Sequence, residues 1–134
     1  MGLSPDQRTL YVADTLSARL WAYDLAGPGE IAAPPPPRRN PARLLATAPG
    51  DVMLDSLAVT EAGNICVGTL INGGVTTFTP AGETRHVALP EPYVTNICFA
   101  GADRQTAFIT RATTGKVVKC RWDEPGLALN FHPY

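Results

Sequence analysis

One acidic residue, Asp55, occupies a position from which it could do chemistry. It stands at the start of a short apolar strand within the stretch Leu54 to Thr69, which has the pattern of a strand, a tight polar turn and a second apolar strand. A carboxylate at the mouth of a strand can bind a hard cation or take a proton from water. The alternative is structural, with Asp55 capping a turn through hydrogen bonds to nearby backbone N–H groups.

The other residues with reactive side chains are not grouped as they are in catalytic sites. The three cysteines form no Cys-x-x-Cys pair and each lies in an apolar run, which predicts reduced, buried thiols and neither a zinc site nor disulfides. The two histidines fall on strands that we expect at the outer edges of the sheets. No serine has the Gly-x-Ser-x-Gly frame of a serine hydrolase. These residues are Cys66, Cys98 and Cys120, then His86 and His132, and then Ser4, Ser17 and Ser56.

The composition is that of one domain with a hydrophobic core and little charge. The chain has 134 residues, of which 45% are hydrophobic and 17% charged, and its net charge is −1. A protein that binds nucleic-acid phosphates needs a basic face, so the charge argues against that class. No apolar run approaches the ~20 residues of a membrane span, and the first residues contain no basic and apolar signal region. We therefore expect a cytoplasmic protein that binds neither nucleic acid nor a membrane.

The elements that would position Asp55 form three similar units of four short strands. No segment combines length with the 3.6-residue apolar period of a helix, and four strands in about 40–45 residues is the period of a propeller blade. The sequence thus predicts an all-β fold of four-stranded antiparallel blades. Blade 1 covers residues 1–48 with a proline-rich insertion at 27–41, blade 2 covers 54–89, and blade 3 covers 94–131 and closes with a strand from Leu127 to Phe131. Corresponding apolar residues recur ten positions apart in each unit: Leu10 and Leu20, Ile65 and Val75, Ala107 and Val117.

The insertion in blade 1 contains four consecutive prolines, Pro34 to Pro37, followed by two arginines. Pro34, Pro37 and Arg39 match a polyproline ligand of SH3-type domains. Short proline motifs of this kind are common by chance, so we interpret the segment as a stiff surface loop between the third and fourth strands of blade 1.

Three blades are fewer than a closed ring requires. Propellers close with about four to eight blades, and the first inner strand is cut short at Met1, so we expect about three blades of six, those of the carboxyl-terminal half. An arc of three blades exposes two open edges and an apolar inner wall, which favour association. We therefore expect the chain to self-associate through these edges or to pair with an N-terminal half.

In order and spacing, several stretches resemble the senescence marker protein (regucalcin)/gluconolactonase/LRE-like family of six-bladed propellers. The resemblance covers essentially the whole chain but only about the second half of the family's fold. The stretches are Gly2 to Asp6, Thr9 to Asp14, Arg19 to Leu25, Leu54 to Val59, Ala62 to Asn64, Asn72 to Val75, Val94 to Gly101, Thr106 to Thr110 and Trp122 to Leu127.

The resemblance implies a function for Asp55. Family members bind one divalent cation near one end of the central channel, and many hydrolyse sugar lactones. Asp55 falls on the position of an Asp that binds the cation and helps to deprotonate the attacking water, although Ser56 replaces the usual Gly and Thr60 replaces the second Asp of the pattern. The other ligands, a Glu and two Asn residues, have no counterpart in this chain. The resemblance thus implies a divalent cation, calcium or zinc, only if the missing half is supplied.

The expected blade geometry gathers other oxygen-bearing side chains at the end of the barrel that holds Asp55. In a four-stranded meander, the start of the inner strand and the loop between the second and third strands lie at the same end. Thr95 and Asn96 should therefore lie near Asp55, together with the loops at 14–17, 70–73 and 111–114. These two residues could belong to the outer shell of a cation site.

Three functional hypotheses follow. The first is the C-terminal half of a metal-dependent lactonase-like hydrolase that opens a sugar lactone or a related ester ring, with Asp55 as its catalytic and metal-binding residue. The second is a non-catalytic propeller module or remnant that binds a partner or a small molecule. A third, a strictosidine-synthase-like propeller, shares the fold without this cation site, and metal-dependent turnover would separate it from the first.

Overall fold

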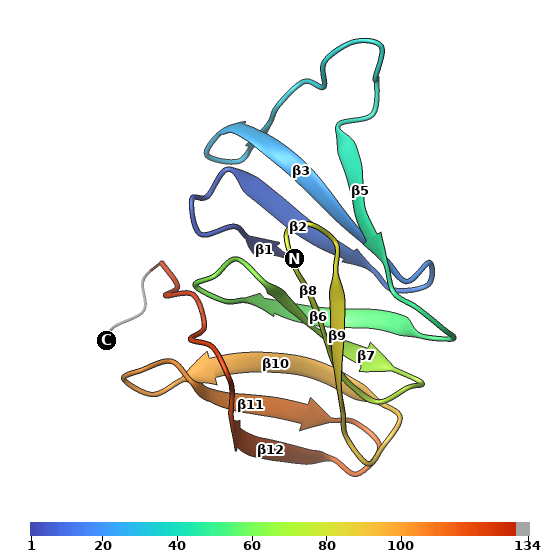
Figure 1. Cartoon of the computed structure of the whole chain (residues 1–134), viewed down its shortest axis with the longest axis vertical. Helices are drawn as coiled ribbons and strands as arrows, with labels where there is room; N and C mark the ends of the chain where they lie inside the picture. Colours follow the sequence, from blue (N-terminus) through green and yellow to red (C-terminus); the bar gives the residue numbers. More distant parts are fainter. Residues whose placement is uncertain (131–134) are drawn as a thin grey trace.

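Three antiparallel sheets follow one another along the longest axis of the molecule (Figure 1), in a computed structural model that describes residues 1–130. Every element in this part of the chain is a β-strand, as predicted. The first sheet contains β1 (Gly2–Leu3), β2 (Thr9–Asp14), β3 (Arg19–Gly27), β4 (Glu30–Ile31) and β5 (Ala42–Thr47). The second contains β6 (Met53–Val59), β7 (Ile65–Leu70), β8 (Gly74–Phe78) and β9 (Thr84–Ala88). The third contains β10 (Val94–Ala100), β11 (Thr106–Arg111) and β12 (Lys116–Arg121).

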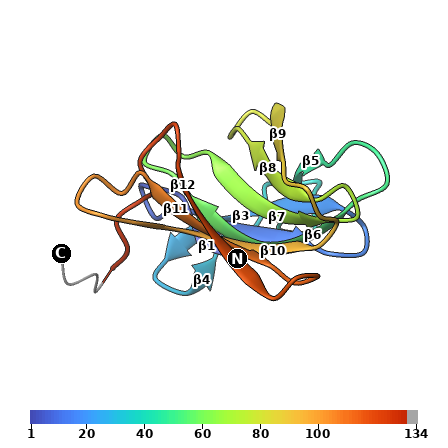
Figure 2. The same ribbon diagram turned by 90° about the horizontal axis from the view of Figure 1, so that it is seen from below.

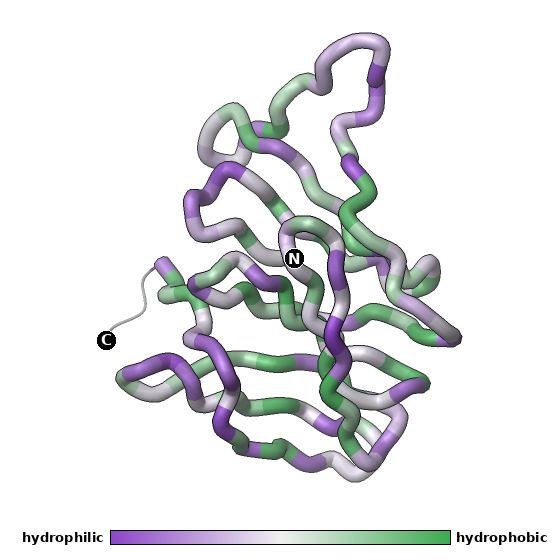
Figure 3. Tube along the Cα trace, in the orientation of Figure 1, coloured by the Kyte–Doolittle hydropathy of each residue, from purple (hydrophilic) through white to green (hydrophobic). Residues whose placement is uncertain are grey.

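The sheets are meanders in which each strand pairs with the next one in the sequence, except that β5 pairs with β3 and not with β4. The innermost strands of the three sheets are β1, β6 and β10. The strands β6 and β10 lie side by side in both views (Figures 1 and 2), and β1 contacts β6. These three strands therefore form one shared inner wall. Hydrophobic residues follow the strands of all three sheets, whereas many connecting loops are hydrophilic (Figure 3). Within residues 1–130 there is no helix long and apolar enough to cross a membrane.

The proline-rich insertion leaves the first sheet and returns to it. Strand β5 pairs directly with β3, with Arg19 opposite Thr47 and Leu20 opposite Ala46. The residues between β3 and β5 thus lie outside the main ladder, apart from the two-residue strand β4, which pairs with the end of β3. The four prolines lack backbone N–H groups and cannot join a ladder, which explains why the chain loops out here.

The third sheet differs from the prediction, because residues 127–130 form no strand and Phe131 lies outside the described residues, as does His132. Pro125 lacks the N–H group that a ladder needs. The segment instead crosses to the second sheet, where the Leu127 N–H donates to the carbonyl of Val59 at 2.9 Å. The Glu124 carboxylate accepts hydrogen bonds from the Thr60 hydroxyl at 2.8 Å and from the Asn64 amide at 2.9 Å. These contacts hold the end of the described chain against blade 2.

Two hydrophobic clusters join the sheets. The first combines Leu20 of the first sheet with Leu54, Ile65 and Phe78 of the second, and each of these side chains is fully buried. The second joins blades 2 and 3 through residues that include Val75, Ile97, Ile109 and Trp122. Burying one such side chain stabilises the fold by about 1.5–3 kcal/mol. The clusters therefore hold the three sheets together as one array.

The prediction of three buried thiols is confirmed for one cysteine only. Cys66 is buried in the second cluster, and burial raises the pKa of its thiol to about 11. Cys98 is exposed and Cys120 is half-buried. The prediction failed for Cys98 because its neighbour Ile97 is buried toward blade 2, so Cys98 points to the opposite face of the third sheet, where it is exposed.

Candidate functional site

Asp55 lies in a β-bulge of the inner strand β6. Leu54 pairs with Thr69 and Leu57 pairs with Val67, so Asp55 and Ser56 together face the single residue Gly68. Leu54 is fully buried and anchors the strand just before the bulge. Bulges of this kind redirect side chains and are frequent next to active sites. Asp55 is half-buried, and Ser56 is exposed.

The neighbouring inner strand has a matching irregularity. In β10, Val94 pairs with Arg111 and Asn96 pairs with Thr110, which leaves Thr95 as the additional residue. Gly68 lies against this point, since a Cβ atom on it would be 2.8 Å from the carbonyl carbon of Thr95. Only a residue without a side chain fits there. The bulges that contain Asp55 and Thr95 therefore flank the same glycine.

Thr95 and Asn96 use their polar atoms locally. The hydroxyl groups of Thr95 and Thr110 lie 2.8 Å apart and share a hydrogen bond. The side-chain oxygen of Asn96 accepts a hydrogen bond from the Ile97 N–H at 2.8 Å. The oxygen atoms that we considered for an outer shell therefore already have partners within the third sheet.

The loop between β2 and β3 also reaches this end of the array. The Leu54 N–H donates to the carbonyl of Thr15 at 3.3 Å, one residue before Asp55. In the same loop the Ser17 N–H donates to the carboxylate of Asp14 at 3.4 Å. Asp14 is thus engaged within its own turn, whereas the Asp55 carboxylate takes part in none of the ion pairs among residues 1–130.

A buried acid that the sequence analysis missed, Glu91, fastens two further loops at this end. Its side chain is only 3% exposed and forms an ion pair with Arg111. Its carboxylate also accepts hydrogen bonds from the backbone N–H and the hydroxyl of Thr114, both at 3.1 Å. Its backbone carbonyl lies against Gly73 in the turn between β7 and β8. Glu91 therefore positions the loops at 70–73 and 111–114 relative to each other, and its place between Pro90 and Pro92 was the only sequence signal.

His86 has a structural role on the outer strand β9, where it was predicted. Its two ring nitrogens lie 2.9 Å from the hydroxyl of Thr76 and 3.2 Å from the carbonyl of Gly73. These contacts occupy both nitrogens inside the second sheet.

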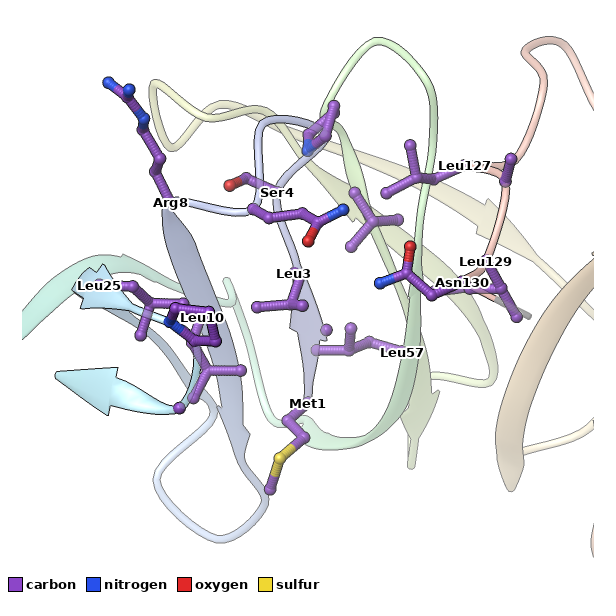
Figure 4. A pocket seen from close by; sticks show the side chains of 18 of the residues that line it. Met1, Leu3, Ser4, Arg8, Leu10, Leu25, Leu57, Leu127, Leu129 and Asn130 are labelled. Carbon is purple, nitrogen blue, oxygen red and sulfur yellow. The ribbon is translucent and has the colours of Figure 1, made fainter. Parts of the chain in front are cut away.

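A groove of about 1300 Å³ runs along the shared inner wall (Figure 4). The strands β1, β6 and β10 form its floor, and the segments 25–31 and 127–130 contribute to its sides. Its lining is mainly apolar and includes Leu3, Leu10, Leu25, Leu57, Leu127 and Leu129. Asn96 contributes to it, but Asp55 is not among the residues that line it. The groove and the Asp55 bulge are therefore separate features of the same wall.

The described residues include the right type of ligand for a cation site but too few ligands to form one. A carboxylate oxygen such as those of Asp55 is the donor that a hard cation prefers, and such a cation takes several oxygen ligands. Within residues 1–130 no three His, Cys, Asp or Glu side chains are grouped as a metal site would require. Asp55 could therefore supply one ligand, and the others would have to come from another segment.

Comparison with known proteins agrees with this architecture. The model of the SMP-30/gluconolactonase/LRE-like region matches residues 1–113. Among solved structures, a luciferin-regenerating enzyme superposes with a TM-score of 0.69 and 22% identity, over 98% of this chain and 38% of its own. Regucalcin of Agrobacterium tumefaciens, described as a calcium-binding protein, superposes with a TM-score of 0.73 and 22% identity, over 95% of this chain and 48% of its own. The chain thus spans less than half the length of these two structures. Its sheets are blades of a β-propeller, and the chain belongs to the SMP-30/gluconolactonase/LRE-like family.

Proposed function

We propose that this chain is the C-terminal half of a cation-dependent hydrolase that opens sugar lactones or related cyclic esters. The observation that carries the proposal is the position of Asp55 in a bulge on the inner strand of a propeller of this family. Its carboxylate is half-buried and is free of ion pairs within residues 1–130. An acid held in this way is available to a cation or to water.

Lactone hydrolysis gives Asp55 a defined task. Water adds to the carbonyl carbon, the bond between that carbon and the ring oxygen breaks, and the ring oxygen leaves as the hydroxyl group of a hydroxy acid. Asp55 accepts a proton from the attacking water, and the ring oxygen is protonated as it leaves the carbonyl carbon. A calcium or zinc ion, when bound, polarises the lactone carbonyl as a Lewis acid. The regucalcin structure that this chain resembles is that of a calcium-binding protein, which supports the choice of cation.

A second candidate is a non-catalytic propeller module that binds a small molecule or a partner. It is favoured by the lack of a grouped metal-ligand set in residues 1–130 and by the mainly apolar groove on the inner wall. The separation of that groove from Asp55 also fits a binding role better than a hydrolytic one. A cytoplasmic location and the absence of nucleic-acid and membrane binding stay predictions for both candidates.

The two candidates differ in turnover of glucono-δ-lactone, assayed with calcium, with zinc and with a chelator. The assay should use the complete translation product that contains residues 1–134. Asp55→Asn is expected to lower kcat by about 10²–10⁴-fold, because the amide cannot accept the proton. Asp51→Asn, which alters an exposed acid four residues earlier, should leave kcat unchanged. Turnover that persists in chelator and in Asp55→Asn would contradict the proposal, and no turnover at all would favour the second candidate.

A further inference from the structure

Blade 3 reaches the Asp55 bulge through a backbone contact at Gly68, which is buried on β7. On one side, β7 forms a regular ladder with β8, in which Gly68 pairs with Val75. On the other side, two residues of β6, Asp55 and Ser56, face Gly68 alone. The irregularity at this level of blade 2 therefore lies in β6, the strand that carries the acid.

The backbone of β10 fills the space that a side chain at position 68 would occupy. A Cβ atom on Gly68 would lie 2.8 Å from the carbonyl carbon of Thr95 and 2.9 Å from the carbonyl oxygen of Val94. The amide nitrogen of Asn96 would be 3.0 Å away. Non-bonded carbon atoms pack best at about 3.5–4.0 Å, so even one methyl group would require a displacement of about 1 Å. All three obstacles are backbone atoms, so no side-chain rotation makes room.

The same crowding explains why Asp55 lies in a bulge. Leu54 belongs to the first hydrophobic cluster and Leu57 packs against it, although the two leucines are three positions apart. A regular β6 would place a single residue between them, opposite Gly68, and would point its side chain at the backbone of β10. The additional residue removes this requirement, and Ser56 is exposed while Asp55 is half-buried. The backbone of β10 thus leaves no room for an acid between blades 2 and 3 at this level.

Blade 3 is held in this position by the segment before β10, which is fixed to both blades. Tyr93 forms a β-bridge with Leu70 of β7. The carbonyl of Tyr93 accepts a hydrogen bond from the Ala112 N–H of blade 3 at 2.9 Å. Two residues earlier, Glu91 is buried in its ion pair. The close approach of β10 to β7 is therefore enforced from outside the bulge.

We propose that Gly68 is a positioning residue of the candidate cation site. By admitting the backbone of β10, it holds the bulge of β6 in the shape that presents the Asp55 carboxylate to a cation. This inference rests on the proposed function for the role of Asp55, but its structural part can be tested without a cation. Binding groups must be held within about 0.5 Å of the productive geometry, so the displacement that a methyl group requires should weaken cation binding.

Calcium titration of the complete translation product should compare Gly68→Ala with Gly126→Ala. Gly126 is also buried between blades 2 and 3, and a Cβ atom on it would lie 2.3 Å from the Cβ atom of Phe99. It forms a bridge with Thr60, beyond the other end of β6, and neither glycine has a positive φ. Gly68→Ala should weaken calcium binding by about 10–100-fold, the effect of losing an outer partner of a metal ligand. Gly126→Ala should lower the melting temperature as well but keep the wild-type calcium affinity.

Amide hydrogen exchange without calcium gives a readout that does not depend on Asp55 as a ligand. In the wild type, the protected amides of residues 53–57 and 94–97 should open together, because one contact holds both bulges. Gly68→Ala should speed exchange in both segments, and Gly126→Ala should leave both at the wild-type rate. The wild-type measurement decides the structural part even if Gly68→Ala does not fold.

The inference would be overturned by wild-type calcium affinity in Gly68→Ala, by an equal loss of affinity in Gly126→Ala, or by independent opening of the two segments in the wild type. Asp55→Asn, titrated in parallel, keeps the two proposals apart. Wild-type affinity of Asp55→Asn would contradict the proposed function and, with it, the role of Gly68 in cation binding. Loss of affinity in Asp55→Asn together with unchanged affinity in Gly68→Ala would contradict the positioning role alone.

Discussion

Replacing Glu91 by alanine is expected to lower the free energy of unfolding by about 3–5 kcal/mol, the cost of removing one partner from a buried ion pair. Glu91 is 3% exposed and its partner Arg111 is 17% exposed, so the arginine left behind would be largely cut off from water. The N–H and hydroxyl groups of Thr114 would lose their acceptor as well. The loss should therefore exceed that of an ordinary surface ion pair, which contributes about 0–1 kcal/mol.

Urea unfolding followed by circular dichroism measures this loss. Glu83→Ala, at an exposed acid in the turn between β8 and β9, is the control and should change stability by less than about 0.5 kcal/mol. In the double variant Glu91→Ala with Arg111→Leu, the unpaired charge is removed, so part of the stability should return. A loss below about 1 kcal/mol for Glu91→Ala would show that this acid does not fasten the loops.

Gly73→Ala is expected to destabilise the protein by about 2–5 kcal/mol, the sum of left-handed backbone strain and overpacking. Gly73 has a φ of +60°, and a Cβ atom on it would lie 1.8 Å from the carbonyl oxygen of Glu91 and 3.1 Å from the Cα atom of Pro92. Both obstacles are backbone atoms, so no side-chain rotation can relieve them. The linker that carries Glu91 would have to move away from the turn between β7 and β8.

Gly115→Ala separates the two causes of the Gly73 effect. Gly115 has nearly the same φ, +62°, but nothing lies within 4 Å of its Cβ position. It should therefore show only the backbone strain, about 1–2 kcal/mol. Equal losses for the two substitutions in thermal or urea unfolding would mean that Glu91 does not press on the turn.

The repeated strands could be predicted because their signal is local. Short apolar runs separated by glycine and proline turns recur at matching positions, and the structure forms strands at the pairs Leu10 and Leu20, Ile65 and Val75, and Ala107 and Val117. Several turns close through neighbouring residues, as in the hydrogen bond between the Gly63 N–H and the Thr60 carbonyl at 2.9 Å. Nothing distant in the sequence is needed to define such an element.

The features that were missed depend on residues far apart in the sequence. The predicted strand from Leu127 is replaced by contacts of Glu124 with Thr60 and Asn64, which lie 64 and 60 residues away. Glu91 is buried because the turns at Gly73 and Thr114 both close on it, and its place between two prolines does not indicate which distant turns it contacts. An apolar run predicts that a thiol is buried only if another sheet covers its face, which is not so for Cys98.

The candidate site likewise combines a feature that the local sequence predicts with one that depends on distant residues. The position of Asp55 on an inner strand follows from the repeat and from the resemblance to the family. The bulge around it does not, because it requires Asp55 and Ser56 to share Gly68 as their partner while Gly68 presses on the backbone near Thr95 in the next blade. Such a contact between blades is decided by packing and not by the sequence around Asp55.

Calcium binding tests most directly whether the Asp55 carboxylate is a cation ligand. It should be measured by titration calorimetry on the complete translation product, for the wild type, Asp55→Asn and Asp51→Asn. Loss of an outer partner of a ligand already weakens metal binding by about 10–100-fold, so loss of a ligand should weaken it by at least about tenfold. We expect that result for Asp55→Asn and wild-type affinity for Asp51→Asn. Equal calcium affinity in all three proteins would show that Asp55 is not a ligand and would contradict the assignment of the site.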